Sequence, residues 1–287
     1  DVIKRFLLLL GIIGLILLVS CAPQQVQCPK VNCPVCETPS QAAQNPLVFV
    51  YSIDVGQGDA TLLKSRETEM LIDCGDNGAG TKVVDFLKEK SVGELEYLMI
   101  THPDSDHLGG CDDVLRSFNT RMVIDNGQAS DTISYKDVMA EIDIEQHVIA
   151  IKDNIWDIGP AQLRVIQANN GLTDKNQNSI VTKLTYKDMD ILLTADCDKD
   201  CENLLLDKDI QSEILKVTHH GSKFGTSINL LDKVMPRVGI ISVGSNSYGP
   251  PAPETLDRLS QEGILVYRTD IEGDITITLD GNSYEVI

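Results

Sequence analysis

The sequence has few aromatic residues and few basic ones. Phe, Trp and Tyr make up 5% of its 287 residues, with a single Trp, so an extended platform for stacking nucleobases is not expected. Lys and Arg total 24 against 43 Asp and Glu, which gives a formal net charge of −19. The Lys and Arg residues form no stripe along the sequence. Such a chain repels polyanions unless metals or a local basic groove offset its charge, so tight binding of duplex DNA is not expected.

Long apolar runs are also scarce, and the one that stands out lies near the start of the chain. Residues 6–19 are almost entirely apolar and follow Lys4 and Arg5. This length is short for a membrane span and is typical of the apolar region of a signal peptide. The run leads into Leu-Val-Ser-Cys, which resembles a lipobox. We expect residues 1–21 to be a lipoprotein signal peptide with Cys21 lipidated, the alternative being a plain N-terminal anchor helix. Either way, we expect a membrane-anchored, extracytoplasmic protein.

The next segment, residues 22–46, has the composition of a tether. It contains five Pro, several Gln and no apolar periodicity, which favours an extended chain. Its cysteines, Cys28, Cys33 and Cys36, lack a fourth ligand for a zinc knuckle, so disulfides within or between chains are the preferred interpretation.

Four further cysteines lie beyond the tether, in a chain expected outside the cytoplasm, where disulfides are permitted. Cys197 and Cys201 are four residues apart and could pair across a turn. Cys74 and Cys111 each follow a motif described below, which raises the hypothesis of a bridge beside the functional site. Apart from Cys21 the cysteines are odd in number, so at least one is unpaired or intermolecular.

Residues 47–287 have the pattern of one α/β domain. Short apolar strands such as LEYLMI and DILLTA alternate with helical patterns such as TKVVDFLKEK. Two strand-rich halves, each with its own helices, predict two packed sheets with helices on the outside.

Four of the five histidines fall into two short clusters. His102-Pro-Asp104-Ser-Asp106-His107 follows the apolar strand at 95–100, and His219-His220 follows a strand at 213–218. Asp196 lies between the two clusters, directly after the apolar strand DILLTA at 190–195. Loops at strand ends are common binding sites in α/β proteins, and imidazoles packed among carboxylates are a favourable set of metal ligands. The alternative for the first cluster is a solvated turn whose side chains cap a helix, and for Asp196 a helix cap.

At this point the sequence resembles a known family. The pattern His102-x-Asp104-x-Asp106-His107 is similar to the signature of the metallo-β-lactamase fold. The motifs DVGQGDA, LIDCG, THPDSDHLGG, LLTAD, THHGSKFGTS and VYRTD further resemble the extracytoplasmic hydrolase domain of the ComEC competence family. They occur in family order over about residues 51–275. The resemblance implies an αββα sandwich with one or two divalent metals, zinc being more expected than manganese.

The resemblance also implies roles for individual residues. His102, Asp104 and one histidine of the 219/220 pair would hold a first metal, Asp106 and His107 a second, and Asp196 would bridge both. His219 is preferred as the ligand because it lies nearer the strand end. His220 would then be a ligand, a proton donor or a residue that orients a ligand. The implied catalytic residues are Asp106, Asp196 and His220.

Other residues would orient ligands or contact substrate. Asp73 would orient a ligating histidine, unless it is only a turn residue, and Asp59 would point into the site. Asn178, Ser222 and Lys223 complete this group, although Lys223 could equally be a solvated loop residue.

Two departures from the family pattern bear on activity. The separate third histidine of many family hydrolases is missing, since the histidine in that interval, His147, lies in a polar segment and reads as a surface residue. Tyr248-Gly249-Pro250-Pro251 stands where the ComEC branch tends to have Tyr-Gly-His-Pro.

The function that this resemblance implies is metal-dependent hydrolysis by activated water. The preferred substrate is a phosphodiester, with external DNA, a single strand or a nucleotide as candidates. The alternatives are an envelope hydrolase of a small ester, lactone or amide, and a non-catalytic metal-binding lipoprotein that docks a partner. No stable protein partner follows from the sequence.

Overall fold

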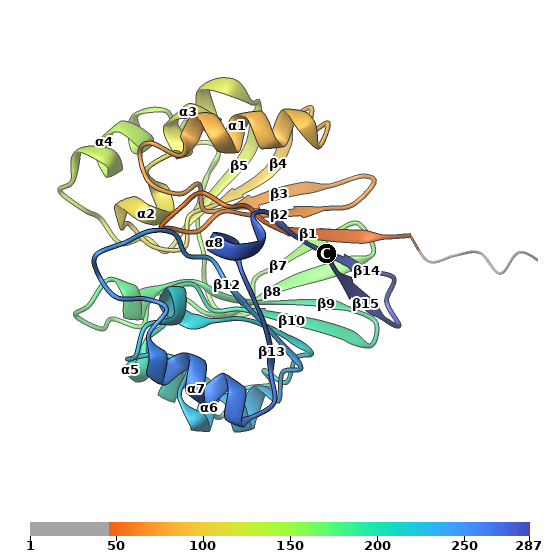
Figure 1. Ribbon diagram of the computed structural model, residues 1–287. Helices are drawn as coiled ribbons and strands as arrows, with labels where there is room; N and C mark the ends of the chain where they lie inside the picture. The colour runs from red at the N-terminus through yellow and green to blue at the C-terminus, as the bar shows by residue number, and fades with distance from the viewer. Residues whose placement is uncertain (1–45) are drawn as a thin grey trace, which may run out of the picture. The chain divides into compact units, whose positions relative to one another are not determined.

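The computed structural model describes residues 46–287, which fold as two β-sheets packed face to face between two layers of helices (Figure 1). The predicted signal peptide, Cys21 and almost all of the predicted tether lie outside the described residues. Within residues 46–287, no helix is both long enough and apolar enough to cross a membrane.

The first sheet has eight strands and is mixed. In spatial order they are β15 (Tyr284–Val286), β14 (Ile275–Leu279), β1 (Val48–Ser52), β2 (Thr61–Lys64), β3 (Glu69–Ile72), β4 (Leu95–Met99), β5 (Thr120–Asp125) and β6 (His147–Ile149). Strands β3 to β6 are parallel. The helices that follow them in sequence are α1 (Gly80–Glu89), α2 (Ser105–Leu108), α3 (Cys111–Ser117) and α4 (Ile133–Ala140). They lie on the outer side of this sheet (Figure 1).

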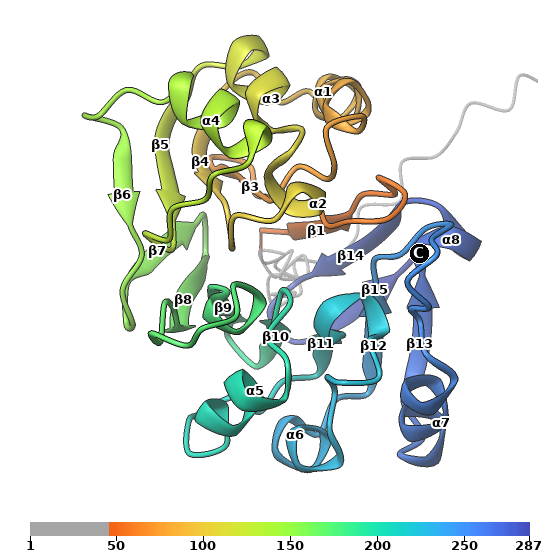
Figure 2. The same ribbon diagram turned by 90° about the vertical axis from the view of Figure 1, so that its left-hand side faces the viewer.

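The second sheet has seven strands. In spatial order they are β13 (Leu265–Arg268), β12 (Val238–Ile241), β11 (Ile214–Lys216), β10 (Met189–Leu193), β9 (Val181–Tyr186), β8 (Ala161–Gln167) and β7 (Ile155–Ile158). Strands β10 to β13 are parallel. Helices α5 (Lys199–Leu205), α6 (Ile228–Val234) and α7 (Pro253–Gln261) cover its outer side (Figure 2). Shorter elements are η1 (Asn176–Asn178), η2 (Thr218–Gly221) and α8 (Thr269–Glu272).

Apolar alternation along the strands builds the core between the sheets. Along β8, Leu163 and Val165 are buried, whereas Gln162 and Arg164 are exposed, because successive side chains of a strand point to opposite faces. Two further apolar clusters lie beneath the outer helices. The structure therefore confirms the predicted αββα sandwich.

Two edge strands were not expected from the sequence. Strand β6 has three residues and β7 has four, and both lie among polar residues that hide the strand pattern. His147, which reads as a surface residue in the sequence, belongs to β6 and is half-buried, with its Nε2 2.9 Å from Oδ2 of Asp125. His147 thus lies at the edge of the first sheet, partly exposed, with its ring against Asp125 and away from the other histidines.

Two disulfides join the four cysteines of the described residues. Cys74 pairs with Cys111, and Cys197 pairs with Cys201. These are the two pairings that the sequence suggested. Cys74 directly follows Asp73, and Cys197 directly follows Asp196, so each bridge holds a segment that carries a candidate site carboxylate.

Candidate metal centre

The candidate ligands follow the ends of three strands. His102 and Asp104 follow β4, and Asp106 and His107 lie in the single turn of α2. Asp196 follows β10, and His219 and His220 lie in η2 after β11. Strands β10 and β11 are parallel neighbours, so their carboxyl ends meet at one edge of the second sheet.

The backbone at these strand ends adopts a conformation that most residues avoid. Asp73, Ala195, His219 and His220 all have positive φ, between 46° and 58°. This left-handed region costs non-glycine residues about 1–3 kcal/mol each and persists where the surrounding structure demands it. The four residues lie next to or within the candidate ligand set. The fold therefore keeps an unfavourable backbone conformation at the positions that orient the candidate ligands.

Asp196 lies at the centre of the histidines. Its Oδ1 is 3.3 Å from Nε2 of His107 and 3.6 Å from Nε2 of His220. Its Oδ2 is 3.4 Å from Nε2 of His219 and 3.9 Å from Nε2 of His102. Each carboxylate oxygen therefore faces a different pair of imidazoles, which is the geometry a bridging ligand needs.

Several buried polar atoms at this centre make no hydrogen bond. They are Nε2 of His102, His107 and His220, and Oδ1 of Asp196. Buried polar atoms in folded proteins are nearly always hydrogen-bonded, and an ion is one of the explanations for an exception. Asp106, His107, Asp196 and His220 can each offer one ligand atom, all within 4.8 Å of one another. These residues fit a divalent cation.

The remaining ring nitrogens are held by hydrogen bonds that leave Nε2 facing the centre. Nδ1 of His107 donates to Oδ2 of Asp73 at 2.7 Å, and Nδ1 of His220 donates to the carbonyl of Ser242 at 2.9 Å. Thr101 donates its hydroxyl to Oδ2 of Asp73 at 2.7 Å, so its oxygen can accept from Nδ1 of His102, 3.1 Å away. Such outer hydrogen bonds fix the tautomer and orientation of a ligating histidine.

The imidazoles and carboxylates of the centre shift one another's pKa values. Burial disfavours the charged form of His107, but Asp196 and Asp73 outweigh it and raise its pKa well above the usual range. For His219, burial is likewise outweighed by Asp198 and Asp196, which raise its pKa to about 9. Burial favours the neutral form of Asp196, but the surrounding histidines hold its pKa well below the usual value.

A cavity of about 340 Å³ opens onto the centre. It is lined by Gln57, Asp76, Asp104, Ser105, Asp106, Asn176, Asp196, His219, His220, Tyr248 and Pro250. Pro250 thus stands in the cavity wall, so the departure from the Tyr-Gly-His-Pro pattern falls where substrate would enter. Tyr248 is 84% exposed. Asn246 fixes this loop, because its Oδ1 accepts from the amides of Tyr248 and Gly249 and its Nδ2 donates to Gln57.

The residues expected to contact substrate or orient ligands have different placements. Asp73 lies behind His107, as described above. Asn178 is buried and closes its own loop, donating to the carbonyls of Leu172 and Asp174. The hydroxyl of Ser222 accepts from the amide of Phe224. Lys223 is exposed, with its ammonium 5.0 Å from the centre of the Phe224 ring. Neither Ser222 nor Lys223 belongs to the cavity lining.

Asp59 lies behind the centre rather than in the cavity wall. It is buried and pairs with Lys216, with Nζ 2.7 Å from Oδ1 and 2.9 Å from Oδ2, and its Oδ1 is 3.8 Å from Nδ1 of His220. The sequence reasoning missed Lys216, as well as Lys175 and Asn176. Lys175 has its Nζ 3.4 Å from Oδ1 of Asp104, and Asn176 has its Nδ2 3.3 Å from Nε2 of His219. The motif around Asn178 pointed to this loop but not to these two residues.

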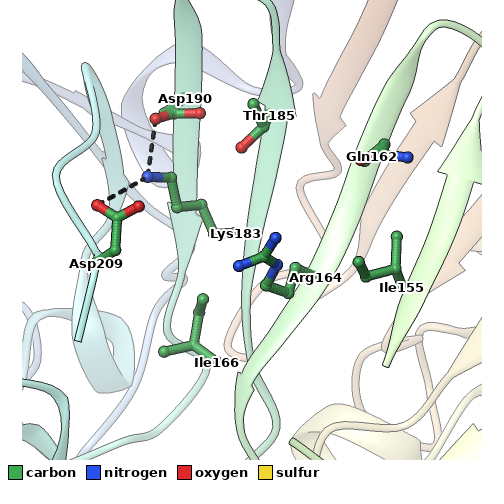
Figure 3. Close-up of a pocket in the computed structure, with 8 residues that line it drawn as sticks. All are labelled: Ile155, Gln162, Arg164, Ile166, Lys183, Thr185, Asp190 and Asp209. Atoms are coloured by element: carbon green, nitrogen blue, oxygen red, sulfur yellow. Dashed lines mark ion pairs between the residues drawn. The ribbon is translucent and has the colours of Figure 1, made fainter. Parts of the chain in front are cut away.

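A second cavity, of about 230 Å³, lies on the outer face of the second sheet (Figure 3). It contains no histidine. Lys183 lies in it and pairs with Asp190 at 2.8 Å and with Asp209 at 3.7 Å. This cavity shares no lining residue with the candidate centre.

Comparisons of the sequence with known proteins point to the same family that the site residues suggested. Residues 53–141 match the family model described as the metallo-beta-lactamase superfamily. The chain is 30% identical, over an alignment of 266 residues, to ComE operon protein 3 of Bacillus subtilis, covering 80% of this chain and 34% of that protein. It is 27% identical to Recombination protein 2 of Haemophilus influenzae, covering 84% of this chain and 30% of that protein. The chain therefore spans about a third of the length of these relatives.

Solved structures show the same fold. The metallo-beta-lactamase fold protein YhfI of Bacillus subtilis superposes with a TM-score of 0.55 at 10% sequence identity, over 80% of this chain and 99% of that protein. The chain is thus a metallo-β-lactamase fold protein with a buried His/Asp cluster that fits a metal. By sequence it is related to the ComEC family of competence proteins.

Proposed function

We propose that the chain is a metal-dependent hydrolase of phosphodiesters, with a nuclease-like activity outside the cytoplasm. The observation that carries this proposal is the arrangement of four histidines around the two oxygens of Asp196, three of which have a buried Nε2 atom without a hydrogen bond. The relationship to competence proteins supports nucleic acid as the substrate class.

The residues divide between two ligand groups. The first group would bind on the Oδ2 side of Asp196 and comprises His102, Asp104 and His219. The second would bind on the Oδ1 side and comprises Asp106, His107 and His220. Both histidines of the 219/220 pair would therefore be ligands, one in each group. Zinc is the first candidate metal and manganese the second. A divalent ion in such a site activates water as a nucleophile and stabilises negative charge on a phosphoryl oxygen.

Two side chains of the site would take part in proton transfer from water and in binding of the substrate phosphate. Asp106 would be the candidate for accepting a proton from the attacking water. Burial disfavours its charged form, but His220 and His107 outweigh burial and lower its pKa, which keeps it a carboxylate at neutral pH and makes it a weaker base in the metal-free chain. Lys175, whose side chain is half-exposed beside Asp104, would contact a phosphate that enters the cavity.

The test is to measure metal content and hydrolysis of bis(p-nitrophenyl) phosphate by the full chain with added zinc or manganese. One to two metals per chain with metal-dependent turnover is the expected result, and Asp106→Ala should abolish turnover. An Asp106→Ala protein that keeps its metal and full activity would refute the assignment. Single-stranded and duplex DNA are the next substrates.

A second candidate function is hydrolysis of a small uncharged ester or lactone. It is favoured by the acidic cavity wall, where Asp76, Asp104 and Asp106 would repel a polyanion unless metals offset them. Turnover of p-nitrophenyl acetate by the metal-loaded chain, without phosphodiester turnover, would select this function.

We also propose that Cys21 carries a lipid that anchors the protein outside the cytoplasm. The apolar run and lipobox-like sequence support this location, as do two disulfides, which persist mainly in oxidising compartments. In a Gram-positive or Gram-negative expression host, the full chain should incorporate radiolabelled palmitate, and Cys21→Ala should abolish that label. Absence of label in the wild-type chain, or equal label in Cys21→Ala, would contradict the lipid anchor.

A further inference from the structure

We propose that Lys216 and Asp59 form a buried ion pair that positions the metal ligands of the two sheets relative to each other. This inference rests on the proposed metal centre and assigns a role to Lys216, which the sequence reasoning did not single out. Lys216 is the last residue of β11 in the second sheet, and Asp59 lies just before β2 in the first sheet. They are 157 residues apart in the chain.

The pair is deeply buried. Both residues are 4% exposed, and the ammonium contacts both carboxylate oxygens, at 2.7 and 2.9 Å. Taking two charges out of water costs several kcal/mol per ion, so a buried ion pair is weak evidence for stability. Apolar residues of similar volume would fill this place between two sheets at least as well. The pair therefore calls for a role other than packing.

The main chain of Asp59 holds the segment that carries Asp106. The amide of Asp59 donates to the carbonyl of Asp106 at 3.0 Å, and the carbonyl of Asp59 accepts from the amide of Gly75 at 2.8 Å. The neighbouring Gly58 has a φ of 137°, and a Cβ there would lie 2.3 Å from the carbonyl oxygen of Asp106. The loop before β2 is thus in direct contact with α2, and moving Asp59 moves Asp106.

The other end of the pair holds the ligands of the second sheet. The carbonyl of Lys216 accepts from the hydroxyl of Thr194 at 2.6 Å, two residues before Asp196. Lys216 itself lies three residues before His219. Across the pair, Oδ1 of Asp59 is 3.8 Å from Nδ1 of His220. One ion pair therefore connects the segments that carry Asp106, Asp196 and His220.

The charge of Lys216 also keeps Asp59 away from His220. Nδ1 of His220 donates to the carbonyl of Ser242, which leaves Nε2 directed at the centre. Without the ammonium, Asp59 would be a buried carboxylate whose near neighbour is this imidazole. We expect it to draw Nδ1 of His220 away from Ser242 and to turn the ring out of its ligating orientation.

The first test is the zinc affinity of Lys216→Met in the full chain, measured by competition with a fluorescent chelator. Loss of outer partners of a metal ligand typically lowers metal affinity about 10–100-fold, and we expect a loss of that size. The matched control is Lys183→Met. Lys183 is also nearly buried and paired with an aspartate, but it lies in the separate cavity of Figure 3. Its replacement should lower the midpoint of urea unfolding and leave zinc affinity unchanged.

The second test separates positioning from the effect of an unpaired charge. Asp59→Leu combined with Lys216→Met removes both charges, so the urea midpoint should recover relative to Lys216→Met alone. Zinc affinity should recover only in part, because the pull of an unpaired Asp59 on His220 is removed but the contact between the sheets is still lost. Full recovery of affinity in the double variant, or unchanged affinity in Lys216→Met, would overturn the positioning role.

These outcomes are distinct from those that test the proposed function. A wild-type chain that binds zinc without hydrolytic turnover would overturn the hydrolase and leave the ion-pair inference standing, since its readout is affinity. A wild-type chain that binds no divalent metal would overturn both.

Discussion

Asp73 accepts a hydrogen bond from Nδ1 of His107 at 2.7 Å, and both residues are buried. The same carboxylate also accepts from the amide and the hydroxyl of Thr101. Asp73 therefore fixes the His107 ring directly and the segment leading to His102 through Thr101. This relationship makes Asp73 the orienting residue of the candidate centre.

We predict that Asp73→Asn lowers zinc affinity about tenfold or more, because an amide binds the imidazole more weakly than a carboxylate does and fixes its tautomer less well. Asn tolerates the positive φ of this position, 58°, so the backbone is not the cause. The measurement is zinc competition with a chelator. Asp153→Asn is the matched control, since Asp153 also has a positive φ, 69°, but is exposed. Equal losses in the two variants would contradict the prediction.

A second prediction concerns the release of protons from the histidines when zinc binds. The carboxylates of the metal-free centre raise the pKa of His107, His219 and His220 in spite of burial, that of His219 to about 9. His219 therefore carries a proton at neutral pH, and the charged forms of His107 and His220 are favoured, whereas metal ligation requires neutral imidazoles. Zinc binding should release protons, and zinc affinity should rise as pH increases from 6 towards 9.

Calorimetric titrations at pH 7.5 in buffers of different ionisation enthalpy measure this release directly. We expect the observed enthalpy to depend on the buffer, and His219→Gln to release fewer protons than the wild type. His147→Gln is the control, because His147 pairs with Asp125 in an edge strand. An enthalpy independent of buffer would show that the metal-free imidazoles are already neutral.

A third prediction compares the two disulfides. Cys74–Cys111 closes a sequence separation of 37 residues, and Cys197–Cys201 one of 4. Restriction of the unfolded chain grows with loop length and amounts to about 4 kcal/mol for the longer loop and about 2 kcal/mol for the shorter one. Cys74→Ser/Cys111→Ser should therefore lower the free energy of unfolding more than Cys197→Ser/Cys201→Ser. Urea denaturation of the two double variants checks the order, and a reversed order would contradict the loop-length argument.

The histidines and aspartates of the centre could be found from the sequence because their signals are local. His102 to His107 form one short motif after an apolar strand, and Asp196 and His219 each follow another such strand. Parallel strands end at the same edge of a sheet, which brings Asp196 and His219 together, whereas the packing of the two sheets brings the His102 to His107 motif to them. The same local alternation of strands and helices was enough to predict the αββα sandwich.

Other parts of the site could not be found in this way because they depend on contacts between distant segments. Lys216 looks like an ordinary strand residue until the packing of the sheets brings it to Asp59. Asn178 was expected near substrate, yet its amide closes its own loop and leaves Asn176 to reach His219. The short strand β7 lacks a signal of its own because it pairs only at the edge of the second sheet.

The last prediction concerns Tyr248 and the proposed nucleic-acid substrate. Tyr248 is 84% exposed at the wall of the cavity, and Asn246 holds its loop against Gln57. An exposed aromatic ring on a loop that Asn246 holds, beside the proposed phosphodiesterase centre, is suited to stacking on a nucleobase, a contact that contributes about 1–3 kcal/mol. Tyr248→Ala should therefore raise KM for a single-stranded oligonucleotide about fivefold or more, with a smaller effect on kcat, and Tyr248→Phe should retain the wild-type KM.

The matched control for Tyr248→Ala is Ile133→Ala, which removes an exposed apolar side chain (77% exposed) from α4, away from the cavity lining. It should leave KM unchanged. Steady-state kinetics on one fluorescent oligonucleotide compare all three variants. If Tyr248→Ala and Tyr248→Phe raise KM equally, the hydroxyl rather than the ring face contacts substrate. If neither changes KM, the bases do not contact this wall, and a substrate without nucleobases becomes the better match for the cavity.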